Sequence, residues 1–595
     1  MKTLSHIPEI DGLRALAVLG VFLFHIDYLN GGFLGVDVFF VISGYLITKI
    51  LNKEKNLNFE IYKAFFIKRF KRLYPALIFV SIIILVISII IIDPINLDRI
   101  GKSGLFSIFF LSNNFFWGES SYFDTSSNLK PFLHTWSLGI ELTFYIVFPL
   151  VFFFILKNNF KTIFFFIIVS SSLIILYVLT KRPLFETNVL NGFFYGKYIN
   201  DTLFFLFPFR FFEFLFGSYI AFYENKKKNF VIFPNLFIFG IIGILFSYYF
   251  FNEETNFLLR TIVICLLTSL IIINKKNKFN FLINNKIFQQ IGLISYSFYL
   301  IHWPLIVLLE FYFFEKLNLI SKVAVFFVSI IFSYLIYRNI EKPFREPLSS
   351  KKKVSIMIAP IIFIFLLFSI NFFNLSNFKV EQYKLDKFNK INFDKKNEFC
   401  ENKHSLKKDV KEKICLVGNE QNADIVIMGD SNGTMWFPGF KLFAEKLNLD
   451  IVSYSRACNN FPHLNMNLSV KFVNCEEVDL TGKTLILGAQ WFNYQNTSHI
   501  NRLINKYVLN ISKIVENRNF KELKQIIIMG QIPNFLKNQF DLNTCFLRPK
   551  FLINIDCEKY FNSSENKNKY LSEIRDFNSK FFENIQKNKT LNEYK

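Results

Sequence analysis

Runs of about 20 apolar residues recur through the first two-thirds of this 595-residue chain and constrain its fold more than any other feature. Each run is long enough to cross the roughly 30 Å hydrocarbon core of a bilayer as a helix. The chain is 52% hydrophobic and contains 81 Phe, which is too apolar for a soluble protein of this length. The runs stop near residue 375, so we expect a helical membrane domain followed by a tail that can bury a core of its own.

Loop charge predicts how these runs are oriented. We expect eleven spans, near residues 10–28, 33–51, 75–92, 136–156, 162–179, 204–223, 230–250, 257–273, 291–313, 321–337 and 355–374. The loops between them alternate between a basic set with 22 Lys and Arg and an opposite set with 7. Because basic loops stay in the cytoplasm, the amino terminus should be cytoplasmic and the last span should export the tail. We interpret residues 104–116, which are apolar but short, as a re-entrant or interfacial segment.

The net charge of +22 raises the question of a nucleic-acid partner. Much of the basic charge lies in the short loops between spans, where it orients a membrane protein. We therefore expect a lipid bilayer as partner and no nucleic acid. The first apolar stretch carries Asp11, Arg14 and His25, unlike the apolar core of a cleavable signal peptide, so we expect it to be the first span.

Cysteine usage agrees with an exported tail. One cysteine, Cys265, lies in a span, and the other six lie in the tail. An even number confined to one region suits disulfides in an oxidising compartment. Neighbour pairing is the simplest of the 15 connectivities, and six free thiols in a cytoplasmic tail are the alternative. No C-x-x-C spacing occurs, so we expect no metal site. The disulfide candidates are Cys400, Cys415, Cys458, Cys475, Cys545 and Cys557.

Ionisable side chains in the first span mark one helix face. Such groups are costly in a membrane and usually face a cavity. Arg14 and His25 are eleven residues apart, which places them on one face about 16 Å apart along the helix axis. Asp11 lies one turn from Arg14 and can pair with it. The face thus combines a cation near the cytoplasmic end with a candidate general base near the outer end.

Two further segments carry polar pairs. The sequence KRFKRLYP places Arg69 and Arg72 one turn apart, which suits phosphate groups. Anchoring at the membrane surface explains the same pair equally well. In LHTWSLGIELTFY, His134 and Glu141 are seven residues apart and share a helix face if the helix begins early enough.

Four more ionisable residues fall within spans. Asp37 enters the second span, and Arg210 and Glu213 lie one turn apart, where they can neutralise each other. His302 precedes Pro304, and either a structural hydrogen bond or catalysis would explain it. Three histidines with several arginines and acids in the spans together predict a polar reaction chamber.

The tail contains a strand that leads into a candidate nucleophile. DIVIMGDSNGTMWF, from residue 424, runs from an apolar strand into Gly429-Asp430-Ser431, and the runs TLILGA and QIIIMG also end in Gly. Strands that alternate with helical stretches predict a doubly wound α/β domain. Active residues lie at the carboxyl ends of such strands, which makes Ser431 the candidate.

Six segments resemble the acyltransferase-3 family of membrane acyltransferases, in the family's order, over about residues 5–346. They are DGLRALAVLGVFLFH, GGFLGVDVFFVISGYLI, RFKRLYPA, LHTWSLGIELTFY, SYSFYLIHWPL and EKPFR. The tail around GDS is similar to SGNH hydrolases. The fusion resembles bacterial O-antigen and polysaccharide O-acetyltransferases.

The resemblance implies a polytopic α-helical membrane domain of ten spans plus one linking span, followed by an α/β SGNH-hydrolase-like extracytoplasmic domain. The expected boundaries are 1–346 for the acyltransferase-3 domain, 347–375 for the linking helix, 376–420 for a linker and 421–595 for the SGNH-like domain. It places the protein in the bacterial inner (plasma) membrane with the tail in the periplasm.

The resemblance also implies an activity. A membrane O-acyltransferase would move an acyl group, expected to be acetyl, from cytoplasmic acyl-CoA to a glycan or lipid-linked glycan. Lipopolysaccharide O-antigen or an exopolysaccharide would be such acceptors, and acyl-CoA would be a substrate, with no bound cofactor. By position in the motifs, His25, Glu141 and Ser431 are the catalytic candidates. Arg14, Arg69 and Arg72 are the donor-binding candidates.

The chain departs from the family at two places. The family usually has a second acid after Glu141, where this chain has Leu142. A serine nucleophile needs a base, and the D-x-x-H block that supplies it in the family does not occur here. We expect either that the sequence is incomplete or that Ser431 lacks its usual base, with His463 and His499 as unsupported substitutes.

Three other functions fit parts of the sequence. Buried Arg, Glu and His also line transporter pathways, but no pair of broken helices occurs at matching positions in two halves. A membrane-anchored glycan esterase would need the missing histidine. A degraded, inactive relative of the transferase would explain the departures.

Overall fold

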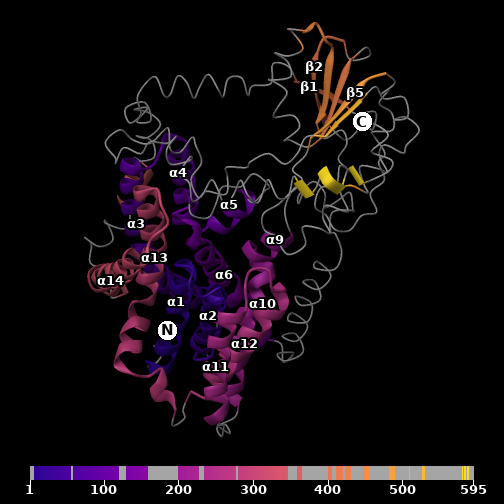
Figure 1. The fold of residues 1–595 in the computed structure, drawn as a ribbon. Coiled ribbons are helices and arrows are strands. Elements are labelled where there is room, and N and C mark those ends of the chain that lie inside the picture. Colours follow the sequence, from indigo (N-terminus) through magenta and orange to yellow (C-terminus); the bar gives the residue numbers. More distant parts are fainter. Residues whose placement is uncertain are drawn as a thin grey trace. The chain divides into compact units, whose positions relative to one another are not determined.

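The computed structural model describes residues 6–54, 58–119, 129–157, 199–226, 234–275, 279–345 and 358–364. In the tail it describes 400–404, 411–419, 423–429, 447–455, 482–488 and 525–528, with isolated short pieces up to residue 587. The chain forms two compact units, one of residues 1–380 with 547–553 and one of residues 381–546 with 554–595. The described part of the first unit is helical, and every described strand lies in the second (Figure 1).

The first unit is a helix bundle (Figure 1). Four of its helices begin at an Asn whose Oδ1 accepts a backbone N–H three residues on, which satisfies an otherwise unpaired donor; these caps are Asn58, Asn256, Asn285 and Asn318. The helices are α1 (Pro8–His25), α2 (Gly35–Leu51), α3 (Phe59–Ile91), α4 (Pro94–Ile108), α5 (Ser112–Glu119), α6 (Trp136–Lys157), α9 (Ile199–Phe205), α10 (Phe207–Lys226), α11 (Pro234–Phe250), α12 (Phe257–Ile273), α13 (Lys286–Phe313), α14 (Leu319–Ile336) and α15 (Lys342–Arg345).

Within the described residues, five helical stretches are long and apolar enough to cross a membrane: 32–51, 59–91, 133–152, 286–313 and 319–345. Helices α1, α10, α11 and α12 lie over four more of the expected spans. The expected span at 162–179 lies outside the described residues, as does most of the one at 355–374. The chain is a multi-pass helical membrane protein, and the count of eleven spans stays a prediction.

Helix boundaries in two segments, 52–74 and 104–116, bear on the sequence prediction. Residues 52–74 were expected to be a loop, but α3 begins at Phe59 because Asn58 caps it, so Arg69 and Arg72 lie on a helix. The segment 104–116 is broken between α4 and α5, where Phe110 has a φ of 57°. Neither helix has the roughly 20 residues that a span needs, and a re-entrant or interfacial position of this segment stays a prediction.

Glycines allow the central helices to approach closely. A Cβ at Gly44 of α2 would lie 1.9 Å from the Phe214 carbonyl oxygen, and a Cβ at Gly217 of α10 would lie 1.8 Å from that of Val41. Small residues at such positions are the usual way in which membrane helices pack backbone to backbone. The contact brings Asp37, in the first turn of α2, to the same interface as α10.

The second unit contains a six-stranded sheet with the order β1-β2-β4-β3-β5-β6. Strands β3 (Ile425–Gly429), β4 (Ile451–Ser455), β5 (Thr484–Gly488) and β6 (Gln525–Ile528) run parallel, while β1 (Cys400–His404) and β2 (Lys411–Val417) extend the sheet as an antiparallel hairpin. Strand β3 lies between β4 and β5, so the connection after β3 leads to one side of it and the connection after β4 crosses to the other. The carboxyl end of β3 is therefore the switch point at which ligands bind in such sheets.

The register of the hairpin bears on one cysteine pair. Cys400 and Cys415 are directly opposed Cα partners of β1 and β2. Opposed residues on antiparallel strands are about 4.5–5.5 Å apart, within the Cα range of a disulfide. We predict that peptide mapping of the non-reduced protein will find these two cysteines linked. Free, alkylatable thiols at both positions would contradict the expected exported tail.

Candidate functional site

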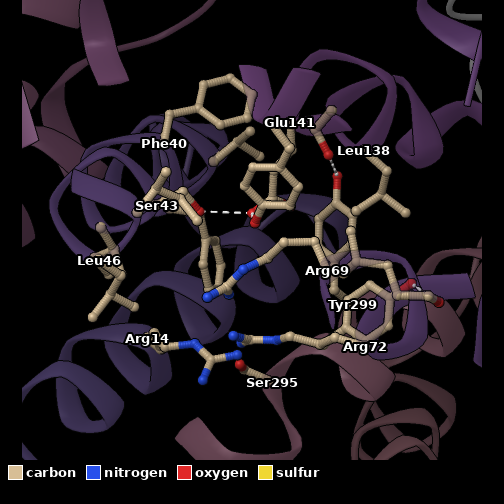
Figure 2. A pocket seen from close by; sticks show the side chains of 18 residues that line it. Arg14, Phe40, Ser43, Leu46, Arg69, Arg72, Leu138, Glu141, Ser295 and Tyr299 are labelled. Carbon is tan, nitrogen blue, oxygen red and sulfur yellow. Dashed lines mark hydrogen bonds between the residues drawn. The ribbon is translucent and has the colours of Figure 1, made fainter. Parts of the chain in front are cut away.

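A cavity with both polar and apolar lining residues lies among α1, α2, α3, α6 and α13. Its volume of about 70 Å³ is enough for several waters or a small group. Figure 2 shows the guanidinium groups of Arg14, Arg69 and Arg72 converging on one region of it. The polar residues that line it are Arg14, Ser43, Arg69, Arg72, Ser137, Glu141, Tyr145, Ser295, Tyr296 and Tyr299.

The arginines of the cavity are only partly neutralised by acids. Arg14 Nη1 donates to Asp11 Oδ1 at 3.2 Å, across one turn of α1. Arg69 Nε is buried without a hydrogen-bond partner among the described residues. Arg72 and Arg345 are both electrostatic neighbours of Arg14. A concave site with this excess of guanidinium groups suits an anionic ligand such as a phosphate.

Glu141 faces this cavity from α6 through a short network. Ser43 Oγ donates to its Oε1 at 2.7 Å, and the Tyr145 hydroxyl donates to the same oxygen (Figure 2). The Arg69 guanidinium carbon lies 5.9 Å from the centroid of the Tyr145 ring. Leu142 and Thr143 supply no second acid here, and the Thr143 hydroxyl bonds back to the Gly139 carbonyl.

Three histidines from three segments form a second cluster. His25, the last residue of α1, places Nδ1 2.9 Å from Nε2 of His302 on α13. His134 lies beside them, with its ring centroid 6.3 Å from that of His302. Its two ring nitrogens make no hydrogen bond of good geometry with the described residues. The carbonyl of Leu300, which lacks its helical donor because of Pro304, lies against the His134 ring.

Tyr299 and Ser137 connect the cavity to the histidine cluster. Both line the cavity, and their hydroxyls bond at 2.8 Å. The Tyr299 hydroxyl also donates to the His134 carbonyl at 2.6 Å, and its ring centroid lies 5.4 Å from that of His134 and 5.7 Å from that of His302. Tyr299 and Ser137 thus lie between the two groups: both line the cavity with the arginines, and the Tyr299 ring packs beside two of the histidines.

A buried ion triad supports α2 against α10. Arg210 Nη1 donates to Asp37 Oδ1 at 2.8 Å and to Glu213 Oε1 at 2.9 Å, and all three side chains are at most 3% exposed. Three aromatic rings surround the guanidinium, with centroids 5.4, 4.9 and 4.7 Å away: Trp136, Phe204 and Phe257. The predicted pairing of Arg210 with Glu213 is present, and Asp37 completes it. None of the three lines the arginine cavity.

The expected shared helix face of His134 and Glu141 is wrong. His134 lies in a 3-10 turn (Leu133–Thr135) before α6 begins at Trp136, so it does not share a helix face with Glu141. Glu141 faces the arginine cavity, and His134 meets His302. Sequence reasoning also missed Ser43, Tyr145 and Tyr299. The two tyrosines lie in the motif segments LHTWSLGIELTFY and SYSFYLIHWPL, and their place in these motifs is the sequence signal that could have identified them.

Family models match both parts of the chain. The model described as an acyltransferase domain matches residues 7–338, more than half of the chain. The chain belongs to the acyltransferase-3 family. A second model, described as an SGNH domain fused to such domains, matches residues 399–583. The acyltransferase-3 match contains the arginine cavity, the histidine cluster and the ion triad.

Relatives of this acyltransferase-3 protein include two named OatA. It is 32% identical over 369 residues to the peptidoglycan O-acetyltransferase OatA of Listeria monocytogenes, over 58% of this chain and 56% of the relative. It is 30% identical over 368 residues to the O-acetyltransferase OatA of Staphylococcus aureus, over 58% of each chain. The chain therefore spans less than two thirds of the length of these curated relatives. No solved structure matches.

The SGNH candidate Ser431 follows β3 but lies outside the described residues, as do His463 and His499. The register aligns Gly429, at the end of β3, with Ser455 of β4 and Gly488 of β5. Ser431 is thus two residues beyond the switch point of the sheet, where the α/β topology would place a site. Among the described residues, no group of three or more His, Cys, Asp or Glu could hold a metal ion.

The arginine cavity gives a prediction about donor binding. For the donor-binding role that the family resemblance implies, Arg69→Ala and Arg72→Ala should each raise the KM for acyl-CoA about tenfold or more, because a hydrogen bond to a charged group is worth about 1.5–3 kcal/mol. Arg→Lys should restore little, because Lys cannot make the bidentate contact. The measurement is initial-rate kinetics in membrane vesicles with acetyl-CoA.

Lys68→Ala is the matched control for these arginines. Lys68 is the exposed neighbour of Arg69 on α3 and does not line the cavity. The Lys68→Ala substitution removes the same charge from the same basic segment, and it should leave the KM unchanged. An equal rise of the KM in all three variants would indicate that the arginines only anchor the helix at the membrane surface.

Proposed function

We propose that this chain is a membrane O-acetyltransferase that moves an acetyl group from cytoplasmic acetyl-CoA to a hydroxyl of a surface glycan. The observation that carries the proposal is that Arg14, Arg69 and Arg72 share a cavity with Tyr299, whose ring packs beside His134 and His302 of the histidine cluster. Membership of the acyltransferase-3 family and the O-acetyltransferase relatives support it.

The donor would bind through its phosphates. Guanidinium groups recognise phosphate oxygens bidentately, and three of them converge on the cavity. Glu141, held by Ser43 and Tyr145, faces the same space and would position the arginines or the thioester end of the donor.

The histidines would supply the acid–base chemistry. The acyl carbon–sulfur bond of the thioester breaks and a new carbon–oxygen ester bond forms. The proton of the sugar hydroxyl goes to His25, and the departing thiolate takes up a proton as free CoA. His25 would act as this base or carry the acyl group itself before the sugar receives it. Ser431 is a candidate for relaying the group outside.

The orientation follows from charge. The loops predicted to be cytoplasmic hold 22 Lys and Arg against 7 on the other side. This would place the amino terminus and the donor in the cytoplasm and the SGNH domain outside the plasma membrane, or inner membrane where a cell has two. The tail would then be in a compartment that permits disulfides.

The acceptor is proposed as a class. The Listeria relative is named for peptidoglycan, and the resemblance to polysaccharide O-acetyltransferases implies lipopolysaccharide O-antigen or an exopolysaccharide. These share free sugar hydroxyls presented outside the membrane, and the proposal commits to that shared chemistry.

Mass spectrometry of the surface glycans from cells with and without the gene tests the proposal. We expect a base-labile acetyl group to disappear from one glycan in the deletion strain and to return with the gene. The His25→Ala gene should fail to restore it. Unchanged glycans in all fractions, including peptidoglycan, would overturn the proposal, and substrate flux without covalent change would favour a transporter.

A further inference from the structure

His302 is fully buried and lies between a backbone carbonyl and His25. Its Nδ1 is 2.9 Å from the Phe298 carbonyl oxygen, and its Nε2 is 2.9 Å from Nδ1 of His25. Its relative exposure is 0%. Both ring nitrogens are therefore engaged, one by a fixed acceptor and one by the candidate catalytic residue.

The Phe298 carbonyl decides which nitrogen carries each proton. A carbonyl oxygen only accepts, so Nδ1 of His302 must carry the hydrogen of that bond. In neutral imidazole the other nitrogen then has only a lone pair, so Nε2 of His302 is an acceptor. The hydrogen of the second bond must come from Nδ1 of His25. His25 Nε2 is left with a free lone pair.

Packing fixes the ring of His302 in this orientation. It stacks on Phe298 with an interplanar angle of 9° and centroids 5.6 Å apart, and Phe22 meets it edge-on at 6.2 Å. The His25 ring lies 4.4 Å from Trp303, the next residue of α13. No described residue hydrogen-bonds Nε2 of His25. This nitrogen is therefore available for chemistry.

We propose that His302 is a positioning residue that holds His25 in the tautomer with a free Nε2 lone pair. The proposal rests on the proposed acyl transfer for its purpose. When Nε2 of His25 takes a proton or an acyl group, the imidazolium keeps its Nδ1–H bond to His302 Nε2, whose lone pair stabilises the new charge. An Asp does this in serine hydrolases. A neutral imidazole avoids placing another unpaired charge inside a membrane.

Glutamine and asparagine at position 302 distinguish a residue that positions His25 from one that only fills the buried site. The amide of a Gln reaches the place of Nε2 and can accept the His25 Nδ1–H bond. The amide of an Asn reaches only the place of Nδ1, so it can bond to Phe298 but not to His25. We expect His302→Asn to lower kcat about 10- to 100-fold, part of the contribution of a general base, with the KM for acetyl-CoA unchanged. His302→Gln should recover most of kcat.

A second readout does not depend on transfer. Diethyl pyrocarbonate modifies the unprotonated nitrogen of a neutral imidazole, and peptide mass spectrometry gives the rate at His25. Without an acceptor at position 302 the free lone pair is no longer fixed on Nε2, so we expect the rate to fall about fivefold in His302→Asn and to hold in His302→Gln. Size-exclusion chromatography in detergent verifies that each variant is folded.

The outcomes are distinguishable. Equal kcat and equal modification rates in folded Asn and Gln variants would overturn the positioning role, whether both match the wild type or both fall. A wild type that transfers no acetyl group, yet shows the Asn–Gln contrast in modification, would overturn the proposed function and keep the role of His302.

Discussion

Replacing His25 with Ala should lower acetyl transfer by about 10²–10⁴-fold, the range that a positioned general base contributes. The two neighbouring histidines cannot substitute for His25. His302 Nε2 bonds to His25, and neither His302 nor His134 lies at the end of α1, where the His25 side chain begins. The protein should stay folded, since the change leaves at most one buried acceptor without its donor, at a cost of about 1–3 kcal/mol. Acetyl transfer in membrane vesicles, normalised to the protein recovered as a single size-exclusion peak, measures the effect.

Lys316→Ala is the matched control. Lys316 pairs with Asp27, two residues beyond His25, at 3.0 Å, but both side chains are more than 60% exposed. An exposed pair of this kind contributes only about 0–1 kcal/mol, so both stability and activity should hold. Wild-type turnover in folded His25→Ala protein would remove His25 from the mechanism.

The second large effect concerns the ion triad and acts on stability. Arg210→Met leaves Asp37 and Glu213 buried with no guanidinium between them. Removing one partner of a buried ionic group costs about 3–5 kcal/mol, because a buried charge is left uncompensated. We expect a large fall in the temperature at which the protein aggregates in detergent, followed by fluorescence-detected size exclusion.

A compensated variant shows whether charge is the cause. Asp37→Asn and Glu213→Gln, added to Arg210→Met, replace both carboxyl groups with neutral amides of similar size. Much of the lost stability should return, because no uncompensated buried charge remains. If Arg210→Met is as stable as the wild type, or if the triple variant is no better than the single one, the triad does not stabilise the contact between α2 and α10.

Helical periodicity limited what could be predicted about the site. It correctly paired Arg14 with Asp11 and Arg210 with Glu213, because neighbours three apart on one helix always face each other. It failed for His134 and Glu141, because a 3-10 turn ends just before the helix that would have joined them. The family motifs supplied the remaining candidates without saying which of them meet.

Sequence by itself determined the helical membrane domain, the polar residues within it, the strand before Ser431 and the family, because apolar run length, residue type and motif order are properties of the chain. Only the tertiary structure decided that Asp37 joins Arg210, 173 residues away, and that His25 meets His302, 277 residues away. The physical reason is that such pairs depend on which helix faces touch. Here that is set by close backbone contacts at residues such as Gly44 and Gly217, which no periodicity along one helix records.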